Sequence, residues 1–344
     1  MAATPGSKRV GGVYFEIEGD DSDFRRTLRQ SETQAKRAGN VISAEFRKTE
    51  VAAAAAQKRI SGVGTSLIAM AAAAGLGIGQ SVSILKDFGQ AMSTVQAVTG
   101  ATEAQMVALT AQARLLGATT RFSATQAAEG MIFLARAGFS ADQALGAIEG
   151  TLQLAQAGAL DLGRAADIAS NVLSGFNLPV SETARVVDVL AKAANSANTD
   201  VNQLGEAMKF AAPTAVALGL GLEETTAIIG KLSDAGIQGG LAGRGFQSLA
   251  TQFENQRDKI EALIGPYDLA VDGISNVIKR LNEAGITTKQ VIEIFRAENL
   301  DVFTILKNAA YDSAKGIDAL NNKLLNARGT AAQVAKTMDD NLNG

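Results

Sequence analysis

An alanine-rich block from Thr119 to Gly243 narrows the range of folds open to this chain, because its apolar residues recur at helical spacing between short turns. In the segment after Ser140, apolar residues fall on one face of a helix and mainly polar residues on the other. The first face carries Ala141, Leu145, Ile148, Leu152 and Ala155, and the second carries Asp142, Gly146, Glu149, Gln153 and Gln156. Each such helix needs a neighbour to cover its apolar stripe, so the pattern predicts packed helices.

The pattern returns in three other segments, and turns interrupt the block at similar intervals. The stripes are Ala127, Met131, Leu134 and Ala135; Val187, Leu190, Ala191 and Ala194; and Ile228, Leu232 and Ala235. The turns Gly138-Phe139-Ser140, Gly175-Phe176-Asn177 and Leu218-Gly219-Leu220 begin 37 and then 43 residues apart. A period of about 40 residues is typical of a two-helix unit stacked on its copies. We therefore predict an all-α fold of stacked helical hairpins, either as a compact domain or as an open solenoid.

Composition supports helices and excludes several classes of function. Apolar residues make up 47% of the chain but aromatic residues only 5%, which favours closely packed helices of Ala, Leu, Val and Ile. The chain contains no cysteine and no histidine, which excludes disulfides, the usual zinc sites and Ser-His or Cys-His catalysis. We therefore expect no enzyme activity, no cofactor and no metal. The net charge of −3 gives no general electrostatic reason to bind nucleic acid, so no sequence-specific nucleic-acid partner is expected.

The N-terminal segment contains the one convincing strand pattern. Val13, Phe15 and Ile17 alternate with polar or charged neighbours, which predicts a short β-strand over residues 13–18. A lone strand needs a partner for its backbone groups, either a cryptic strand or the same strand of another copy. We favour the second copy and therefore predict self-association through these three residues; a frayed, extended tail is the alternative. A long charged helix is expected to begin near Phe24.

Residues 60–85 form an uncharged stretch of 26 residues, long enough as a helix to cross a bilayer. Its many glycine, serine, threonine and alanine residues weaken the case for membrane insertion. Gly75 and Gly79 are spaced so that two helices could approach closely at this point. We favour buried helical packing and self-association through this pair, and keep transient membrane contact through 60–85 as the alternative.

Several short motifs predict local structure. The spacing of a capping box predicts five helix starts: Thr102 with Gln105, Ser123 with Gln126, Ser140 with Gln143, Asp200 with Gln203, and Thr287 with Gln290. Pro213 is expected to end or kink a helix at Ala212. The glycine-rich run from Gly236 to Gly245 lacks the context of a phosphate-binding loop, so we interpret it as a flexible interhelical turn or a subunit contact.

Four acidic residues show no partner in the sequence that would suggest catalysis. We interpret Asp161, Asp167, Asp188 and Glu206 as isolated residues on the polar faces of helices. The secretory type of N-terminal signal is also not indicated, because no apolar run follows Lys8 and Arg9. Synthesis in the cytoplasm is therefore expected.

Five linked motifs lie between Leu85 and Gly243. They are Arg136-Ala137-Gly138-Phe139-Ser140, Leu154-Ala155-Gln156-Ala157-Gly158, Ala165-Ala166-Asp167-Ile168-Ala169-Ser170-Asn171, Ala211-Ala212-Pro213 and Asp234-Ala235-Gly236-Ile237-Gln238-Gly239. Their order and spacing resemble the core of phage tail tape measure proteins, and the resemblance implies synthesis in the cytoplasm of a bacterial host. Two motifs depart from that family's usual pattern: Ala242-Gly243-Arg244-Gly245-Phe246 and Ile294-Phe295-Arg296. Family members usually continue into long helical sequence beyond the position of Gly344, so we expect a fragment or an unusually short member.

The resemblance implies a structural role in the virion tail. It implies an internal scaffold in the lumen of the tail tube that sets tube length during assembly and leaves before DNA passes. The implied partners are the tail-tube protein, the tail assembly chaperones and further copies of the chain. A membrane-active or pore-forming translocated protein and a helical-repeat protein-binding adaptor are the rival functions.

Four segments are expected. They are an extended N-terminal segment with the strand (1–19), a charged helix with the uncharged alanine- and glycine-rich segment and a linking helix (20–118), the tape-measure-like helical core (119–253), and a smaller C-terminal helical region (254–344).

Overall fold

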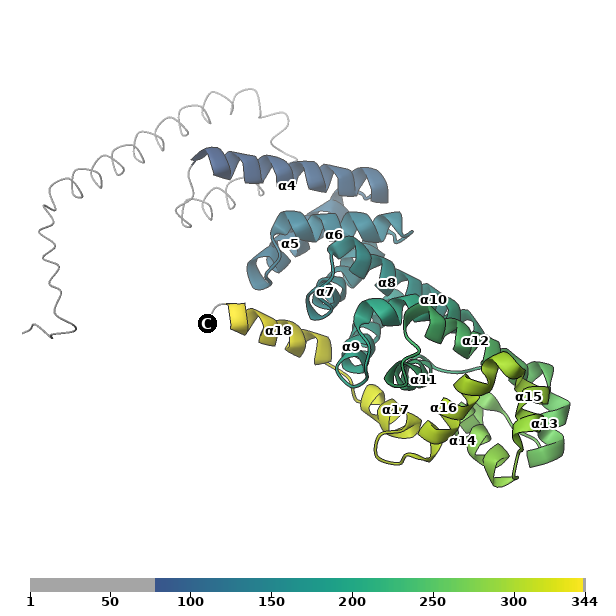
Figure 1. Cartoon of the computed structure of the whole chain (residues 1–344). Helices are drawn as coiled ribbons and strands as arrows, with labels where there is room; N and C mark the ends of the chain where they lie inside the picture. Colours follow the sequence, from purple (N-terminus) through teal and green to yellow (C-terminus); the bar gives the residue numbers. More distant parts are fainter. Residues whose placement is uncertain (1–77, 343–344) are drawn as a thin grey trace, which may run out of the picture. The chain divides into compact units, whose positions relative to one another are not determined.

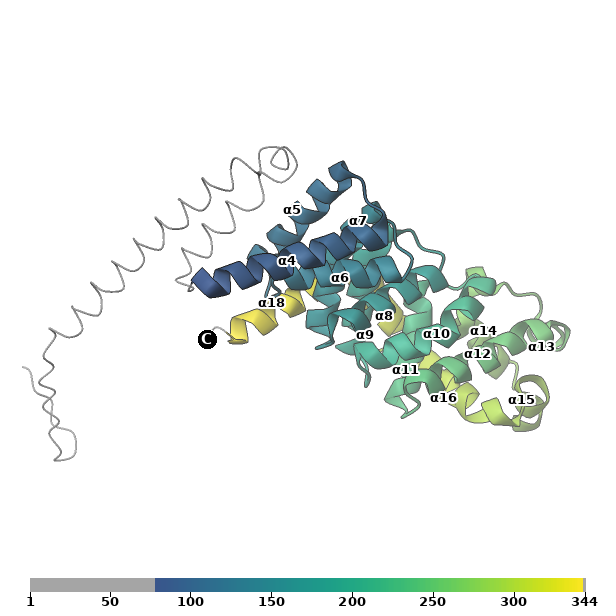
Figure 2. The same cartoon turned by 90° about the horizontal axis from the view of Figure 1, so that it is seen from above.

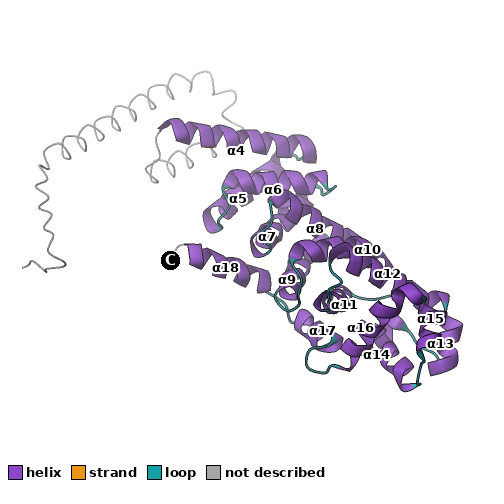
Figure 3. Cartoon of the chain, viewed as in Figure 1, coloured by secondary structure: helices purple, strands orange, loops and turns teal. Residues whose placement is uncertain are grey.

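A computed structural model describes residues 78–342, which form helices joined by turns (Figures 1 and 3). This confirms the all-α class for that part of the chain, where no strand is present. The elements are α4 Ile78–Thr99, α5 Glu103–Thr119, α6 Ala124–Arg136, α7 Ala141–Ala157, α8 Leu162–Gly175, η1 Val180–Glu182, α9 Thr183–Ala194, α10 Val201–Ala217, α11 Leu222–Asp234, α12 Gly239–Asn255, α13 Arg257–Ile264, α14 Leu269–Glu283, α15 Thr288–Phe295, η2 Ala297–Asn299, α16 Leu300–Tyr311, α17 Ile317–Leu325 and α18 Thr330–Leu342.

Residues from Lys86 onward form one compact unit. Within it, helices two places apart in the chain lie against each other, in two rows (Figures 1 and 2). One row contains α6, α8, α10 and α12, and the other contains α5, α7, α9 and α11. The expected segment boundaries at 118/119 and 253/254 fall inside this unit, at the end of α5 and within α12.

The C-terminal helices return along the second row. Helix α16 contacts α11 and α12, α17 contacts α9 and α11, and α18 contacts α7 and α9. The second row is therefore covered by α6, α8 and α10 on one side and by the returning helices on the other. This double coverage explains why α7 and α9 bury residues around most of their circumference.

Six interhelical connections between residues 134 and 288 share one backbone design. A residue with positive φ lies two positions after the last residue of a helix, the next residue is apolar, and the third is the N-cap of the next helical element. The positive φ matters because the two amides after the helix then turn back to its last carbonyls, as in the Schellman motif. At Gly138 these bonds run from Gly138 N to Ala135 O and from Phe139 N to Leu134 O. The same pair of bonds recurs at Ala159, Asn177, Gly219, Gly236 and Gly285.

The predicted helix starts are largely confirmed. Thr102, Ser123, Ser140 and Thr287 each form a complete capping box with the glutamine three residues later. Asp200 accepts a hydrogen bond from Gln203 N, but the Gln203 side chain contacts Thr199 and Gln238 instead of closing the box. The predicted apolar stripe of α7 is buried at Ala141, Ile148, Leu152 and Ala155.

One alternative of each of two local expectations is wrong. Pro213 does not end its helix, because α10 continues to Ala217. Pro213 lacks the amide that would bond to the carbonyl of Lys209, and both residues are exposed. The glycine-rich run is not a flexible turn beyond Gly239, because residues 239–245 form the first two turns of α12.

Gly243 shows why that helix contains glycines. A Cβ atom at this position would lie 2.2 Å from the carbonyl oxygen of Ala207 in α10. The backbones of α10 and α12 therefore touch, and only glycine fits between them. The two helices also bury large side chains along their length: Leu204 and Met208 in α10, and Phe246, Leu249 and Phe253 in α12.

The residues expected to mediate self-association are not tested by this structure. Val13, Phe15, Ile17 and Gly75 lie outside the described residues, and Gly79 lies in the first turn of α4. Most of the uncharged stretch 60–85 is also outside them. None of the helices between residues 78 and 342 has the length and apolar content needed to span a membrane.

Candidate functional site

The candidate site is a contact surface, which we call the C-terminal seam. It comprises α17, α18 and their connection, residues 326–329, together with the surfaces of α7, α9 and α11 that they cover. Among residues 78–342, no group of three or more His, Cys, Asp or Glu side chains is placed to hold a metal ion. The chemistry of the seam is that of hydrogen bonds, ion pairs and apolar contact.

Asp188 connects α9 to the start of α18. Its two carboxylate oxygens accept hydrogen bonds from the amides of Gly329, at 2.6 Å, and Ala331, at 2.9 Å. A carboxylate at this place satisfies amides that lack a partner in the helix and interacts favourably with the helix dipole. Asp188 is only 6% exposed, so its interpretation as an isolated polar-face residue is wrong. The returning helix covers what the sequence alone presents as a solvent-facing side.

Gln156 of α7 makes the second polar connection to α18. Its side-chain amide donates a hydrogen bond to the carbonyl of Ala335 at 2.6 Å, and the residue is 4% exposed. The part of the predicted polar face that carries Gln156 is therefore covered by α18. Asp142, Gly146 and Glu149 from the same predicted face are exposed.

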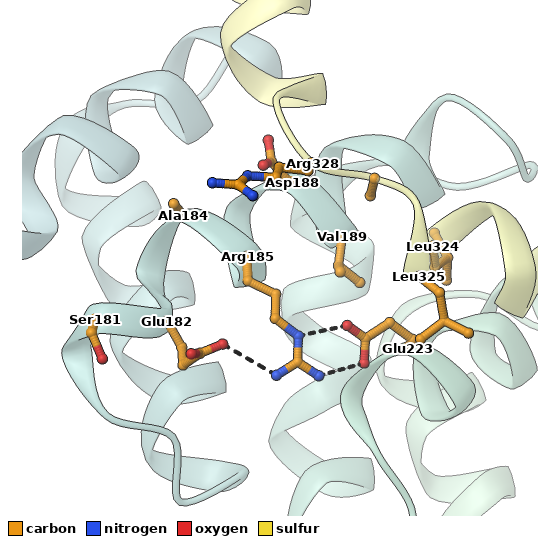
Figure 4. Close-up of a pocket in the computed structure, with 11 residues that line it drawn as sticks. Ser181, Glu182, Ala184, Arg185, Asp188, Val189, Glu223, Leu324, Leu325 and Arg328 are labelled. Atoms are coloured by element: carbon orange, nitrogen blue, oxygen red, sulfur yellow. Dashed lines mark hydrogen bonds and ion pairs between the residues drawn. The ribbon is translucent and has the colours of Figure 1, made fainter.

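Arg185 of α9 binds both α11 and the preceding short helix η1 (Figure 4). Its Nε and Nη2 atoms donate to the two carboxylate oxygens of Glu223 in α11, each at 2.7 Å, and Nη1 donates to Glu182 at 3.2 Å. The hydrogen bonds to Glu223 are the main cause that raises the pKa of Arg185. Such a planar, two-point pair fixes the relative position of α9 and α11 better than a single contact would.

Two cavities, each of about 440 Å³, lie along the seam. The first lies beside the Arg185 cluster and the connection before α18, and is lined in part by Ala184, Asp188, Leu324, Leu325 and Arg328 (Figure 4). The second lies between α5, α7 and α18, and is lined in part by Leu116, Leu152, Gln153, Ala332 and Lys336. Helix α18 is therefore bordered by two open pockets.

A charged cluster on α8 and α10 lies away from the seam. Arg164 donates to Asp167 and Asn202, each at 2.7 Å, and to Glu206, which also pairs with Lys209. The hydrogen bond from Arg164 is the main cause that lowers the pKa of Glu206. Asp167 and Glu206 are thus joined to one arginine, whereas their sequence positions suggested isolated residues.

Asp161, the remaining member of that acidic set, is the N-cap of α8 and accepts from Arg164 N. Glu224 was not singled out by sequence. It accepts a hydrogen bond from Ile274 N at 2.9 Å, next to Gly273, where α14 is interrupted by a non-helical residue. Burial is the main cause that raises the pKa of Glu224, and the charge of Asp318 adds to it.

Comparison with known proteins assigns the chain to a family. The model of the phage-related minor tail protein family matches residues 110–343, which is more than half of the chain. The chain belongs to this family. The match begins within α5 and extends through both rows and the C-terminal seam, so the folded unit and the family region largely coincide.

Relatives of the chain carry the name of the family that the sequence motifs resemble. The chain is 30% identical over 345 aligned residues to the tape measure protein of Pneumococcus phage Dp-1. It is 31% identical over 275 residues to the probable tape measure protein of Escherichia phage P2. The alignments cover 96% and 75% of this chain but 29% and 34% of those relatives, so the chain spans about a third of their length. No solved structure matches the chain.

Proposed function

We propose that this chain is the folded part of a phage tail tape measure protein, a structural scaffold inside the tail tube. The match of residues 110–343 to the minor tail protein family, together with relatives named as tape measure proteins, carries this proposal. In this role the protein lies in the tube lumen while tube subunits assemble around it, sets the length of the tube, and leaves before DNA passes. It acts without catalysis.

The fold suggests that one part of such a scaffold sets length and another part serves assembly. A continuous helix adds about 1.5 Å of length per residue, but the chain reverses after helices of 12–17 residues between α6 and α12. We infer that these helices are stacked hairpins that contribute little axial length. Length would then be set by helical sequence elsewhere in a longer parent protein, and the unit from Lys86 onward would serve assembly.

The proposed partners follow from the same role. They are the tail-tube protein, the tail assembly chaperones and other copies of the chain, encountered after synthesis in the cytoplasm of the bacterial host. We further propose that self-association uses Val13, Phe15 and Ile17, and close packing at Gly75 and Gly79. Replacing Phe15 and Ile17 together by Asp should lower the mass measured by light scattering, because charged residues would interrupt the apolar face of a strand pair. An unchanged mass would contradict this assignment.

Two deletion series in the phage test the role. Removing whole heptads from helical sequence beyond Gly344 in a longer parent chain should shorten tails in proportion, because the helix face stays in register. Removing α8 and α9 should instead abolish tail assembly, because their neighbours lose their packing partners. Tail lengths are measured by electron microscopy. Tails that keep the parental length after the heptad deletions would contradict the proposal.

A further inference from the structure

The returning helices cover the second row one position at a time. Helix α16 lies on α11, α17 lies on α11 and α9, and α18 lies on α9 and α7. The next position in this series is the junction of α7 and α5, at the end of the row. One of the two cavities beside α18 lies at this junction, between α5, α7 and α18. We call it the terminal groove, and we call the other cavity the Arg185 pocket.

The walls of the terminal groove are faces of helices. The four lining residues of α7, from Glu149 to Gln156, follow the spacing i, i+3, i+4 and i+7, and the four of α18, from Ala332 to Asp339, repeat it. Residues at this spacing share one face of a helix, so each wall extends over two turns, or about 10 Å of axial rise. A trough between parallel helix faces suits another helix, because helices pack ridge into groove.

The bottom of the terminal groove is apolar and its rim is charged. Leu116 of α5, Leu152 of α7 and Ala335 of α18 line it and are buried. Glu149 and Asp339 are its acidic lining residues. An apolar strip bordered by charges is the surface that an amphipathic helix covers, with its own apolar face inward and its charged side chains at the edges.

The two pockets differ in how their acidic groups are satisfied. In the Arg185 pocket, Glu182 and Glu223 pair with the arginine, and Asp188 accepts hydrogen bonds from two amides. In the terminal groove, Glu149 and Asp339 form no ion pair with any other residue between 78 and 342. The acids of the terminal groove therefore remain open to a cation from outside.

We propose that the terminal groove binds a basic amphipathic helix of a partner protein. Two acids against one lysine, Lys336, leave the rim negative, so lysine or arginine side chains beside the partner's apolar face pair with Glu149 and Asp339. The apolar face covers Leu116 and Leu152 and adds one helix to the series of α16, α17 and α18. The proposal does not depend on the tail role and adds an interaction surface to the protein.

Thiol labelling of the full-length chain tests the proposal, because the chain contains no cysteine. Ala332→Cys places one thiol in the terminal groove, and Ala184→Cys places one at the Arg185 pocket; both alanines are exposed residues that line their pocket. The probe is a synthetic amphipathic peptide of leucine, alanine and lysine, and the same peptide with glutamate in place of lysine is its control. The lysine peptide should slow maleimide labelling of Ala332→Cys severalfold and leave Ala184→Cys unchanged.

Removing the rim charges tests the electrostatic part. Glu149→Gln and Asp339→Asn, added to Ala332→Cys, should remove most of the protection, because they change charge and preserve shape. Glu283→Gln and Asp258→Asn are the matched control, since they remove two exposed acids outside the groove and should leave the protection unchanged. Circular dichroism checks that each variant folds. Equal protection by the lysine and glutamate peptides, or no protection of Ala332→Cys, would overturn the proposal.

Labelling without peptide separates other occupants of the groove. The Ala332→Cys thiol should then react about as fast as that of Ala184→Cys at every protein concentration. Slow labelling at all concentrations would indicate that another segment of the same chain fills the groove. Slowing that grows with protein concentration would indicate a second copy. Either result would overturn the assignment of the groove to a partner helix.

Discussion

The crossing of α10 and α12 and the attachment of α18 to α7 and α9 are two solutions to packing helices in one protein. At the crossing, Gly243 brings two backbones into contact, and both helices bury large side chains such as Met208 and Phe246. At the seam, α18 buries Ala331 and Ala335 and half-buries Val334 and Met338, and two polar side chains bond to its backbone beside two open pockets. The comparison shows that helix pairs in contact can differ in the free energy needed to separate them.

The largest effect is expected at the crossing. Gly243→Ala places a Cβ atom against the Ala207 carbonyl, so the two helices must separate and lose packing over their buried faces. We expect a loss of about 3 kcal/mol or more in the free energy of unfolding, measured in urea. Gly240→Ala in the same helix is the control, because its added Cβ would meet Phe210 at an ordinary 3.4 Å. Equal losses in the two variants would show that the backbone contact is not decisive.

A smaller and local effect is expected at the seam. Asp188→Ala leaves the amides of Gly329 and Ala331 without their partner, at a cost of about 1–3 kcal/mol. The loss should appear in the attachment of α18, seen as faster proteolysis near residues 326–329, with little change in the main unfolding transition. Asp167→Ala, which removes an exposed partner of Arg164, should leave this proteolysis unchanged. A global loss of stability in Asp188→Ala would remove the distinction between the two regions.

The smallest effect concerns pH. Burial raises the pKa of Glu224, so the folded protein favours the protonated carboxyl; the resulting stabilisation is present in acid and is lost as pH rises through the folded-state pKa. Glu224→Gln should therefore gain stability over the parent from acid to neutral pH, while still accepting from Ile274 N. Thermal unfolding at several pH values measures this gain.

Glu206 gives the opposite sign and serves as the control for that series. Its pKa is lowered by Arg164, so its stabilisation is present above the unfolded-state pKa and is lost as pH falls through the folded-state pKa. Glu206→Gln should be slightly less stable than the parent at neutral pH and equal to it in acid. The same trend with pH in both variants would contradict the assignment of Glu224 to a buried site.

Local sequence patterns predicted the elements well. Four capping boxes and the buried stripe of α7 formed as the residues indicated, because caps and helical periodicity depend on near neighbours in the chain. The family motifs likewise indicated the right family. The turn triplets at Gly138 and Gly219 also match the observed connections.

Long-range packing was not predictable in the same way. The sequence around Asp188 and Gln156 gives no sign that these residues are covered, because the covering helix lies some 140 to 180 residues further along the chain. From the sequence, Gly243 was interpreted as part of a flexible turn, because no local signal distinguishes a glycine in a turn from one at a helix crossing. A partial signal for the crossing was available in the apolar residues Phe246, Leu249 and Phe253, which continue a helical stripe from Ala242.

Hydrogen exchange of the native protein, measured by mass spectrometry, tests most directly whether α18 opens at a lower free-energy cost than the crossing of α10 and α12. The account predicts that amides of α10 and α12 exchange only through global unfolding, whereas those of α18 exchange earlier and together through local opening. Asp188→Ala should accelerate exchange in α18 and leave α10 and α12 unchanged. Protection of α18 equal to that of α10 and α12, or acceleration of all three helices by Asp188→Ala, would contradict the account.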